Sequence, residues 1–80
     1  MTDAPHILLV DDDRRIRELL ATYLKSNGFM VTAASNAAEA RRALDGLAFD
    51  IVLLDIMMPG EDGLALASSL RADGNNVPIL

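Results

Sequence analysis

A chain of 80 residues is long enough for one small domain, and a hydrophobic content of 51% favours a packed core over a disordered segment. With no cysteine and a single histidine, the sequence excludes disulfides and thiolate metal sites and leaves carboxylates as the plausible metal ligands. The net charge of −5 argues against nucleic-acid binding by these residues, and no apolar run approaches the roughly 20 residues of a membrane span, so we expect a cytoplasmic protein.

The first predicted unit is a strand followed by an amphipathic helix. A continuous apolar run at residues 6–10 is typical of a strand that is covered on both faces. Asp13 is placed to cap a helix that begins at Arg14, and Asn27-Gly28 tolerates the left-handed conformation at its end. The apolar stripe of this helix has helical spacing and predicts its buried face: Ile16, Leu19, Leu20, Tyr23 and Leu24.

Two further units follow with the same alternation. A weaker strand is predicted at residues 29–34, and Asn36 with Glu39 resembles a capping box at the start of a second helix. The third strand, residues 49–54, ends in Asp55, and Asp62 is placed to cap a third helix that closes near Gly74. Residues 77–80 have the composition of a fourth strand that has just begun.

The order of these elements predicts an α/β fold. Strands that are apolar at consecutive positions and alternate with helices are typical of a doubly wound parallel sheet with helices on both faces. Because the last residues only open a fourth strand, we expect an uncovered sheet edge and an unfinished core.

Acidic residues follow two of the predicted strands directly. Asp11, Asp12 and Asp13 come after the first strand, and Asp55 comes after the third. The carboxyl ends of neighbouring parallel strands meet at one edge of a sheet, where functional groups of this fold class collect. Clustered carboxylates repel one another unless a cation neutralises them, and oxygen ligands suit Mg²⁺. A carboxylate beside such an ion can act as the nucleophile in phosphoryl transfer.

Three segments resemble the receiver domain of two-component response regulators: LLVDDDRRIRELLATYL, FDIVLLDIMMPGEDGL and the closing VPIL. The acidic pair after the first strand, combined with Asp-x-x-x-Pro-Gly after the third, is a specific signal. The resemblance implies a flavodoxin-like sheet of strand order 2-1-3-4-5. It covers about the first two thirds of a usual receiver, so we expect residues 1–80 to form a receiver domain that is incomplete at its C-terminus and truncated after the start of strand 4.

The resemblance also implies roles for four residues. Asp55 is expected to be the phosphoacceptor, which takes a phosphoryl group from the phosphohistidine of a sensor histidine kinase. Asp12 is expected to bind Mg²⁺ directly and Asp11 mainly through water, while Asp55 and the backbone carbonyl of Met57 complete the ligands. Asp13 lies one position past the acidic pair and is assigned to helix capping. A receiver catalyses its own phosphorylation and is not a conventional enzyme.

Further expectations follow from what usually lies beyond the matched residues. The Thr or Ser after strand 4 and the Lys at the end of strand 5 would come after residue 80, so we expect slow or negligible phosphorylation of this chain. The site and the GEDG turn resemble the OmpR-like branch, in which a DNA-binding domain that regulates transcription follows the receiver. The cations Arg14, Arg15 and Arg17 are interpreted as a solvent-exposed helix face, with kinase docking as the alternative.

Competing functions were weighed on the same residues. A phosphatase of the haloacid dehalogenase type needs Asp-x-Asp-x-Thr or Val, whereas Arg15 takes the last place here. A calcium loop from Asp11 lacks glycine at its sixth position and has Thr22 where glutamate is needed. A non-catalytic interaction module, in which two chains form a homodimer through the exposed sheet edge, remains as the alternative function.

Overall fold

Strands and helices alternate along the chain in the computed structural model, which describes residues 4–55 and 63–80. The strands are β1 (His6–Val10), β2 (Met30–Ala34) and β3 (Ile51–Leu54), and the helices are α1 (Arg14–Ser26), α2 (Ala37–Gly46) and α3 (Gly63–Ala72). The predicted alternation is confirmed. Strands β2 and β3 begin one and two residues later than the apolar runs suggested.

The sheet is parallel, with β1 at its centre and the order β2-β1-β3. This order matches the first three strands of the expected fold. Residues 77–80 run beside β3 in the parallel direction: the Val52 amide donates to the Pro78 carbonyl at 2.8 Å, and the Leu80 amide donates to the Val52 carbonyl at 2.9 Å. The segment thus begins a fourth strand at the predicted place.

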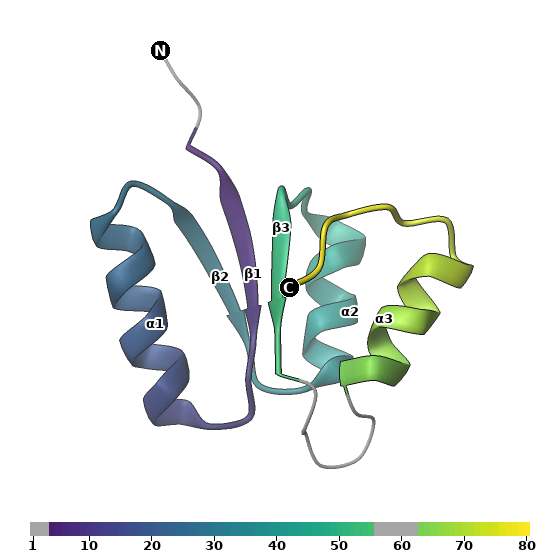
Figure 1. Cartoon of the computed structure of the whole chain (residues 1–80), viewed down its shortest axis with the longest axis horizontal. Coiled ribbons are helices and arrows are strands. Elements are labelled where there is room, and N and C mark those ends of the chain that lie inside the picture. Colours follow the sequence, from purple (N-terminus) through teal and green to yellow (C-terminus); the bar gives the residue numbers. More distant parts are fainter. Residues whose placement is uncertain (1–3, 56–62) are drawn as a thin grey trace.

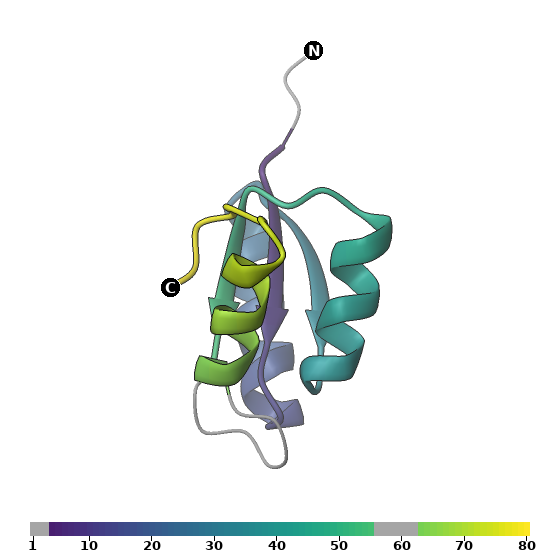
Figure 2. The ribbon, with the colours of Figure 1, turned by 90° about the vertical axis from the view of Figure 1, so that its right-hand side faces the viewer.

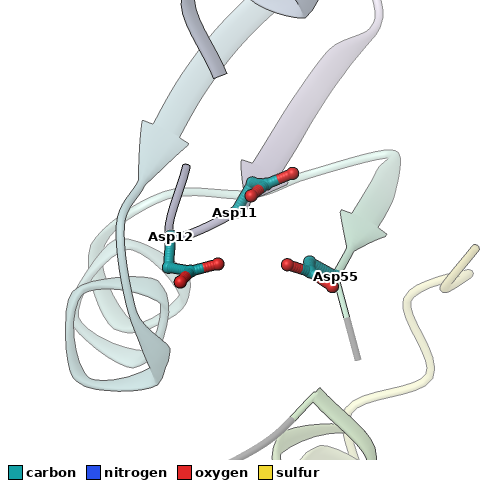
Figure 3. A group of neighbouring side chains, drawn as sticks. All are labelled: Asp11, Asp12 and Asp55. Atoms are coloured by element: carbon teal, nitrogen blue, oxygen red, sulfur yellow. The ribbon is translucent and has the colours of Figure 1, made fainter. Parts of the chain in front are cut away.

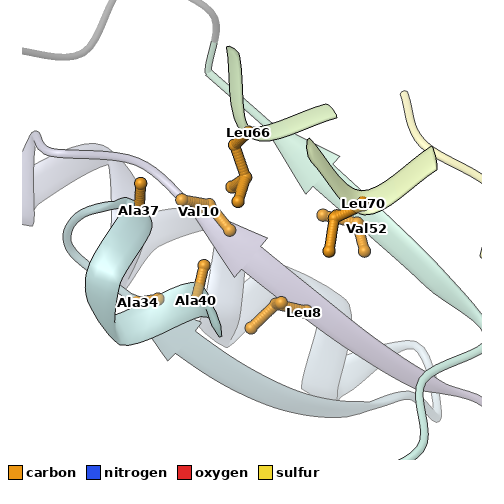
Figure 4. Packing of buried hydrophobic residues seen from close by; sticks show 8 residues of the cluster. All are labelled: Leu8, Val10, Ala34, Ala37, Ala40, Val52, Leu66 and Leu70. Atoms are coloured by element: carbon orange, nitrogen blue, oxygen red, sulfur yellow. The ribbon is translucent and has the colours of Figure 1, made fainter. Parts of the chain in front are cut away.

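The helices cover both faces of the sheet, α1 on one side and α2 with α3 on the other (Figures 1 and 2). The main core lies on the second side, where alternate residues of each strand point (Figure 4). Its buried members are Leu8, Val10, Ala34, Ala37, Ala40, Val52, Leu66 and Leu70. Full burial of a leucine such as Leu8 or Leu66 contributes about 1.5–3 kcal/mol.

Helix α1 presents a different face to the sheet from the one its apolar stripe predicted. Its half-buried residues are Arg17, Ala21 and Leu24, of which only Leu24 belongs to the predicted stripe. The exposed fraction of the other four stripe residues ranges from 38% at Leu20 to 68% at Leu19. The physical reason is that α1 packs chiefly on β2, the edge strand, rather than over the centre of the sheet, so most of the stripe stays exposed. We call Ile16, Leu19, Leu20 and Tyr23 the outer face of α1.

The caps that position the helices follow the prediction with one difference. The Asp13 carboxylate accepts from the amides of Arg15 and Ile16 at 2.9 and 3.2 Å, and Gly28 adopts φ +91° after α1. At α2, Asn36 accepts from the Glu39 amide at 2.8 Å, but Glu39 reaches back to Ser35 rather than to Asn36. The predicted cap at Asp62 lies outside the described residues.

Candidate metal site

Three aspartates meet at the carboxyl edge of the sheet. Asp11 and Asp12 follow β1 and Asp55 follows β3, and each offers a carboxylate oxygen within 4.8 Å of the others. The carboxylates of Asp12 and Asp55 point toward one another from opposite sides of the group (Figure 3). We call these three residues the acidic site. The sequence predicted this convergence from residues that lie far apart along the chain.

The backbone at this edge explains why the carboxylates converge. Val10 and Leu54 are register partners in the parallel pair of β1 and β3, so the residues that follow them leave the sheet side by side. The Asp55 amide donates to the Val10 carbonyl at 2.9 Å, and the Asp11 amide donates to the Ala34 carbonyl of β2 at 3.1 Å. The acidic site is therefore attached to all three strands.

The environment differs among the three carboxylates. Asp11 and Asp55 are half-buried, whereas Asp12 is exposed. One oxygen of Asp11 already accepts from the Asp13 amide at 2.9 Å, which closes the turn between β1 and α1. Asp13 directs its own carboxylate to the start of α1 and does not join the group.

The donor set fits a hard divalent cation such as Mg²⁺. All of its ligand atoms are carboxylate oxygens, and three negative charges this close repel one another without a cation. Two oxygens bound directly to one magnesium ion lie at most ~4.2 Å apart, since each bond is about 2.1 Å long. The separations of the three oxygens, all within 4.8 Å, are of this order. Met57, the fourth expected ligand, lies outside the described residues.

An apolar hollow of about 350 Å³ lies beside the acidic site. It lies between α1 and strands β1 and β3, beside the last residues of the chain. Asp11 and Asp55 of the acidic site are among the residues that line it. Its lining residues are Leu9, Val10, Asp11, Leu20, Leu53, Leu54, Asp55 and Leu80. The carboxylates thus stand at the edge of an apolar surface, where charges are screened less than in open water.

Arg17 contacts the backbone at this edge of the sheet, a role that the sequence did not predict. Its side chain is half-buried, and its Nη1 donates to the carbonyl of Asp11 at 2.9 Å. The sequence placed Arg17 among the solvent-exposed cations of α1. The one available signal was its spacing of four and seven residues from Ala21 and Leu24, which makes Arg17 part of the inward face.

Glu39 lies near this edge at the first turn of α2. Hydrogen bonds from the hydroxyl and the amide of Ser35, both 2.6 Å long, lower the pKa of Glu39 below its ordinary value of 4.5. The positive charges of Arg42 and Arg17 lower this pKa further. The guanidinium of Arg17 therefore acts electrostatically on α2 as well as contacting the turn after β1.

Comparison with known proteins identifies the family. Residues 7–80 match the model of the response regulator receiver domain. The chain belongs to this family. Among curated relatives, PetR of Rhodobacter capsulatus is 61% identical over 67 residues, and the transcriptional activator PfeR of Pseudomonas aeruginosa is 49% identical over 70 residues. These matches cover 84% and 88% of this chain but only 28% and 23% of the two relatives, so the chain spans about a quarter of their length.

Solved receivers share the fold closely. A receiver protein from Pseudomonas putida has a TM-score of 0.93 at 34% identity, with 99% of this chain and 67% of that chain covered. TrrA of Thermotoga maritima, solved in complex with Mg²⁺ and BeF, has a TM-score of 0.87 at 39% identity, with 94% and 65% covered. TrrA has also been solved in complex with the histidine kinase ThkA. Within residues 4–55 and 63–80, no helix is long and apolar enough to cross a bilayer.

Proposed function

We propose that this chain is a phosphoacceptor receiver domain in which Asp55 takes a phosphoryl group from a sensor histidine kinase, with Mg²⁺ at the acidic site. The observation that supports this most is the convergence of three carboxylates from two strands at one edge of the sheet. Membership of the receiver family and the kinase complex of TrrA point in the same direction.

In the proposed reaction Asp55 is the nucleophile. One of its carboxylate oxygens attacks the phosphorus of phosphohistidine, so that a P–O bond forms while the P–N bond breaks. The imidazole nitrogen keeps the bonding electrons and takes up a proton. Bound Mg²⁺ would screen the carboxylates against the incoming phosphoryl group and stabilise its equatorial oxygens.

The three acidic residues would divide the work of holding the ion. Asp12 is exposed and directed toward Asp55, which suits a direct ligand. Asp11 already gives one oxygen to the Asp13 amide, which suits contact through water. The Met57 carbonyl, which lies outside the described residues, would add a further ligand. Because the chain itself receives the phosphoryl group, it is better described as a self-phosphorylating switch than as a conventional enzyme.

The proposed partners follow from this role. The kinase would deliver the phosphoryl group, and in a longer protein a separate effector domain would bind DNA, in keeping with the name of PfeR as a transcriptional activator. The acidic charge of this segment gives it no part in DNA contact. Such a phosphorelay operates in the cytoplasm, where we place the chain.

The acceptor assignment is tested with acetyl phosphate and Mg²⁺, followed by intact-mass measurement and peptide mapping. We expect a slow gain of one phosphoryl group that requires Mg²⁺ and maps to Asp55. Asp55→Asn removes the nucleophile with little change in shape. Asp50→Asn is the matched control, because Asp50 lies at the opposite end of β3. A phosphoryl adduct that persists in Asp55→Asn would rule out the assignment.

A second candidate function is an interaction module that pairs with another copy of this chain. The outer face of α1 is exposed, and Leu80 at the sheet edge is 74% exposed. Among the described residues β2 pairs with β1 on one side only, and the unpaired backbone groups of such an edge strand can pair with a second chain. Size-exclusion chromatography with light scattering tests this; a monomer at every micromolar concentration would exclude it.

A further inference from the structure

Helix α1 turns one of its three leading arginines toward the acidic site. Arg14 pairs with Glu18 at 3.0 Å on the exposed side of the helix, and Arg15 is exposed as well. Arg17 instead lies on the face that packs against the sheet, in line with Ala21 and Leu24. A charged residue that is half-buried at this position needs a polar partner.

The partner of Arg17 is the backbone at the point where the acidic site begins. Its Nη1 donates to the Asp11 carbonyl at 2.9 Å. This carbonyl belongs to the peptide plane that joins Asp11 to Asp12, so a fixed carbonyl also fixes the positions of the Asp12 nitrogen and Cα, from which the Asp12 side chain leaves the backbone. On its other side, Asp11 is held by the hydrogen bond from its amide to Ala34.

From this geometry we infer that Arg17 is a positioning residue for the metal site: it orients the Asp11–Asp12 peptide so that both carboxylates face Asp55. The inference rests on the proposed function, because it concerns the Mg²⁺ that the acidic site would hold. Nη1 of Arg17 contacts a neutral carbonyl, so this hydrogen bond uses no carboxylate oxygen of the acidic site. Groups that hold metal ligands in place change metal affinity by about 10–100-fold when they are lost.

The position of Arg17 also connects the acidic site to α2. The charge of Arg17 reaches Glu39, whose carboxylate holds the Ser35 amide and hydroxyl at the start of that helix. This electrostatic effect on Glu39 is small beside the hydrogen bonds from Ser35, and the direct contact of Arg17 with the turn after β1 is its hydrogen bond to the Asp11 carbonyl.

The test compares Arg17→Met, Arg17→Lys and Arg42→Met by calorimetric titration with Mg²⁺. Arg17→Met keeps the apolar part of the side chain, and we expect it to weaken Mg²⁺ binding about tenfold or more. Arg17→Lys retains a cationic donor and should restore part of the affinity. Arg42→Met removes an exposed charge that also acts on Glu39, and it should leave Mg²⁺ affinity within about twofold of wild type.

A measurement without metal separates positioning from mere stability. In Mg²⁺-free protein, Arg17→Met should shift the amide NMR resonances of Asp12 and Asp13 and speed hydrogen exchange at the Asp13 amide, which bonds to the Asp11 carboxylate. Arg42→Met should not. Wild-type affinity in Arg17→Met, together with unchanged resonances, would overturn the inference. If wild type binds no Mg²⁺, the proposed function fails, and the amide measurement still decides whether Arg17 orients this turn.

Discussion

Asp11, Asp12 and Asp13 are consecutive in the chain but differ in what their carboxylates contact. Asp11 closes the turn by accepting from the Asp13 amide, Asp13 accepts from two amides of α1, and Asp12 faces Asp55. The three aspartates therefore differ in role: Asp11 closes the turn and would meet the ion through water, Asp12 is a candidate direct ligand, and Asp13 is a helix cap. The backbone hydrogen bonds at the end of β1 impose this division.

Glu39 provides a prediction at the residue scale that concerns acid stability. Its pKa is lower in the folded chain, first because the Ser35 hydroxyl and amide bond to its carboxylate and then because Arg42 and Arg17 lie near. A lowered folded-state pKa stabilises the fold above the ordinary value of 4.5, and this contribution disappears as the pH falls through the folded-state value. The difference in unfolding free energy between wild type and Glu39→Gln should thus be largest near neutral pH.

Urea denaturation of both proteins across the acidic range measures this difference. The other carboxylates are common to the two proteins, so their titration largely cancels in the comparison. Glu18→Gln, a change on the exposed side of α1, serves as the control for removing one negative charge. A difference for Glu39→Gln that grew as the pH fell would contradict the assigned direction.

At the scale of elements, local signals predicted where the helices begin and end. Asp13 and Gly28 each work through a few neighbouring backbone groups, so their effects are visible in the sequence.

The packing of α1 could not be predicted in the same way. Most of its predicted buried face is exposed, because an apolar stripe shows which residues are apolar but not which element lies beside them. The acidic site was foreseen because parallel strands end at one edge. The spacing of Arg17 from Ala21 and Leu24 could have placed it on the inward face, but its partner is a backbone carbonyl, which the sequence does not reveal.

The cap of α1 gives the prediction at this scale. Asp13→Ala removes the acceptor for the amides of Arg15 and Ile16 and should lower the free energy of unfolding by about 1 kcal/mol. Asp13→Asn keeps a capping oxygen and should cost only a fraction of that. Chemical denaturation of the three proteins in Mg²⁺-free buffer measures both values. Equal losses in the two variants would show that charge, and not the hydrogen bonds, supports this end of α1.

At the scale of the whole molecule, the acidic site and the core lie on the same framework. At the edge that carries the carboxylates, the amides of Asp11 and Asp55 form hydrogen bonds that join β1 to β2 and β3. Charge repulsion among the carboxylates therefore acts directly on the sheet. The core, by contrast, is concentrated between the sheet and helices α2 and α3, and the outer face of α1 is exposed. With so small a core, a bound cation should change the stability of the entire domain.

Magnesium should therefore stabilise the fold by mass action. At a free Mg²⁺ concentration 100 times the dissociation constant, we expect the free energy of unfolding to rise by about 2.7 kcal/mol. Urea titrations with MgCl₂ and with NaCl of equal ionic strength separate binding from general screening. In Asp12→Asn the increase should disappear, while the Mg²⁺-free stability should equal or exceed that of wild type, since one of three repelling charges is gone. The same increase in Asp12→Asn would place the stabilising ion somewhere other than the acidic site.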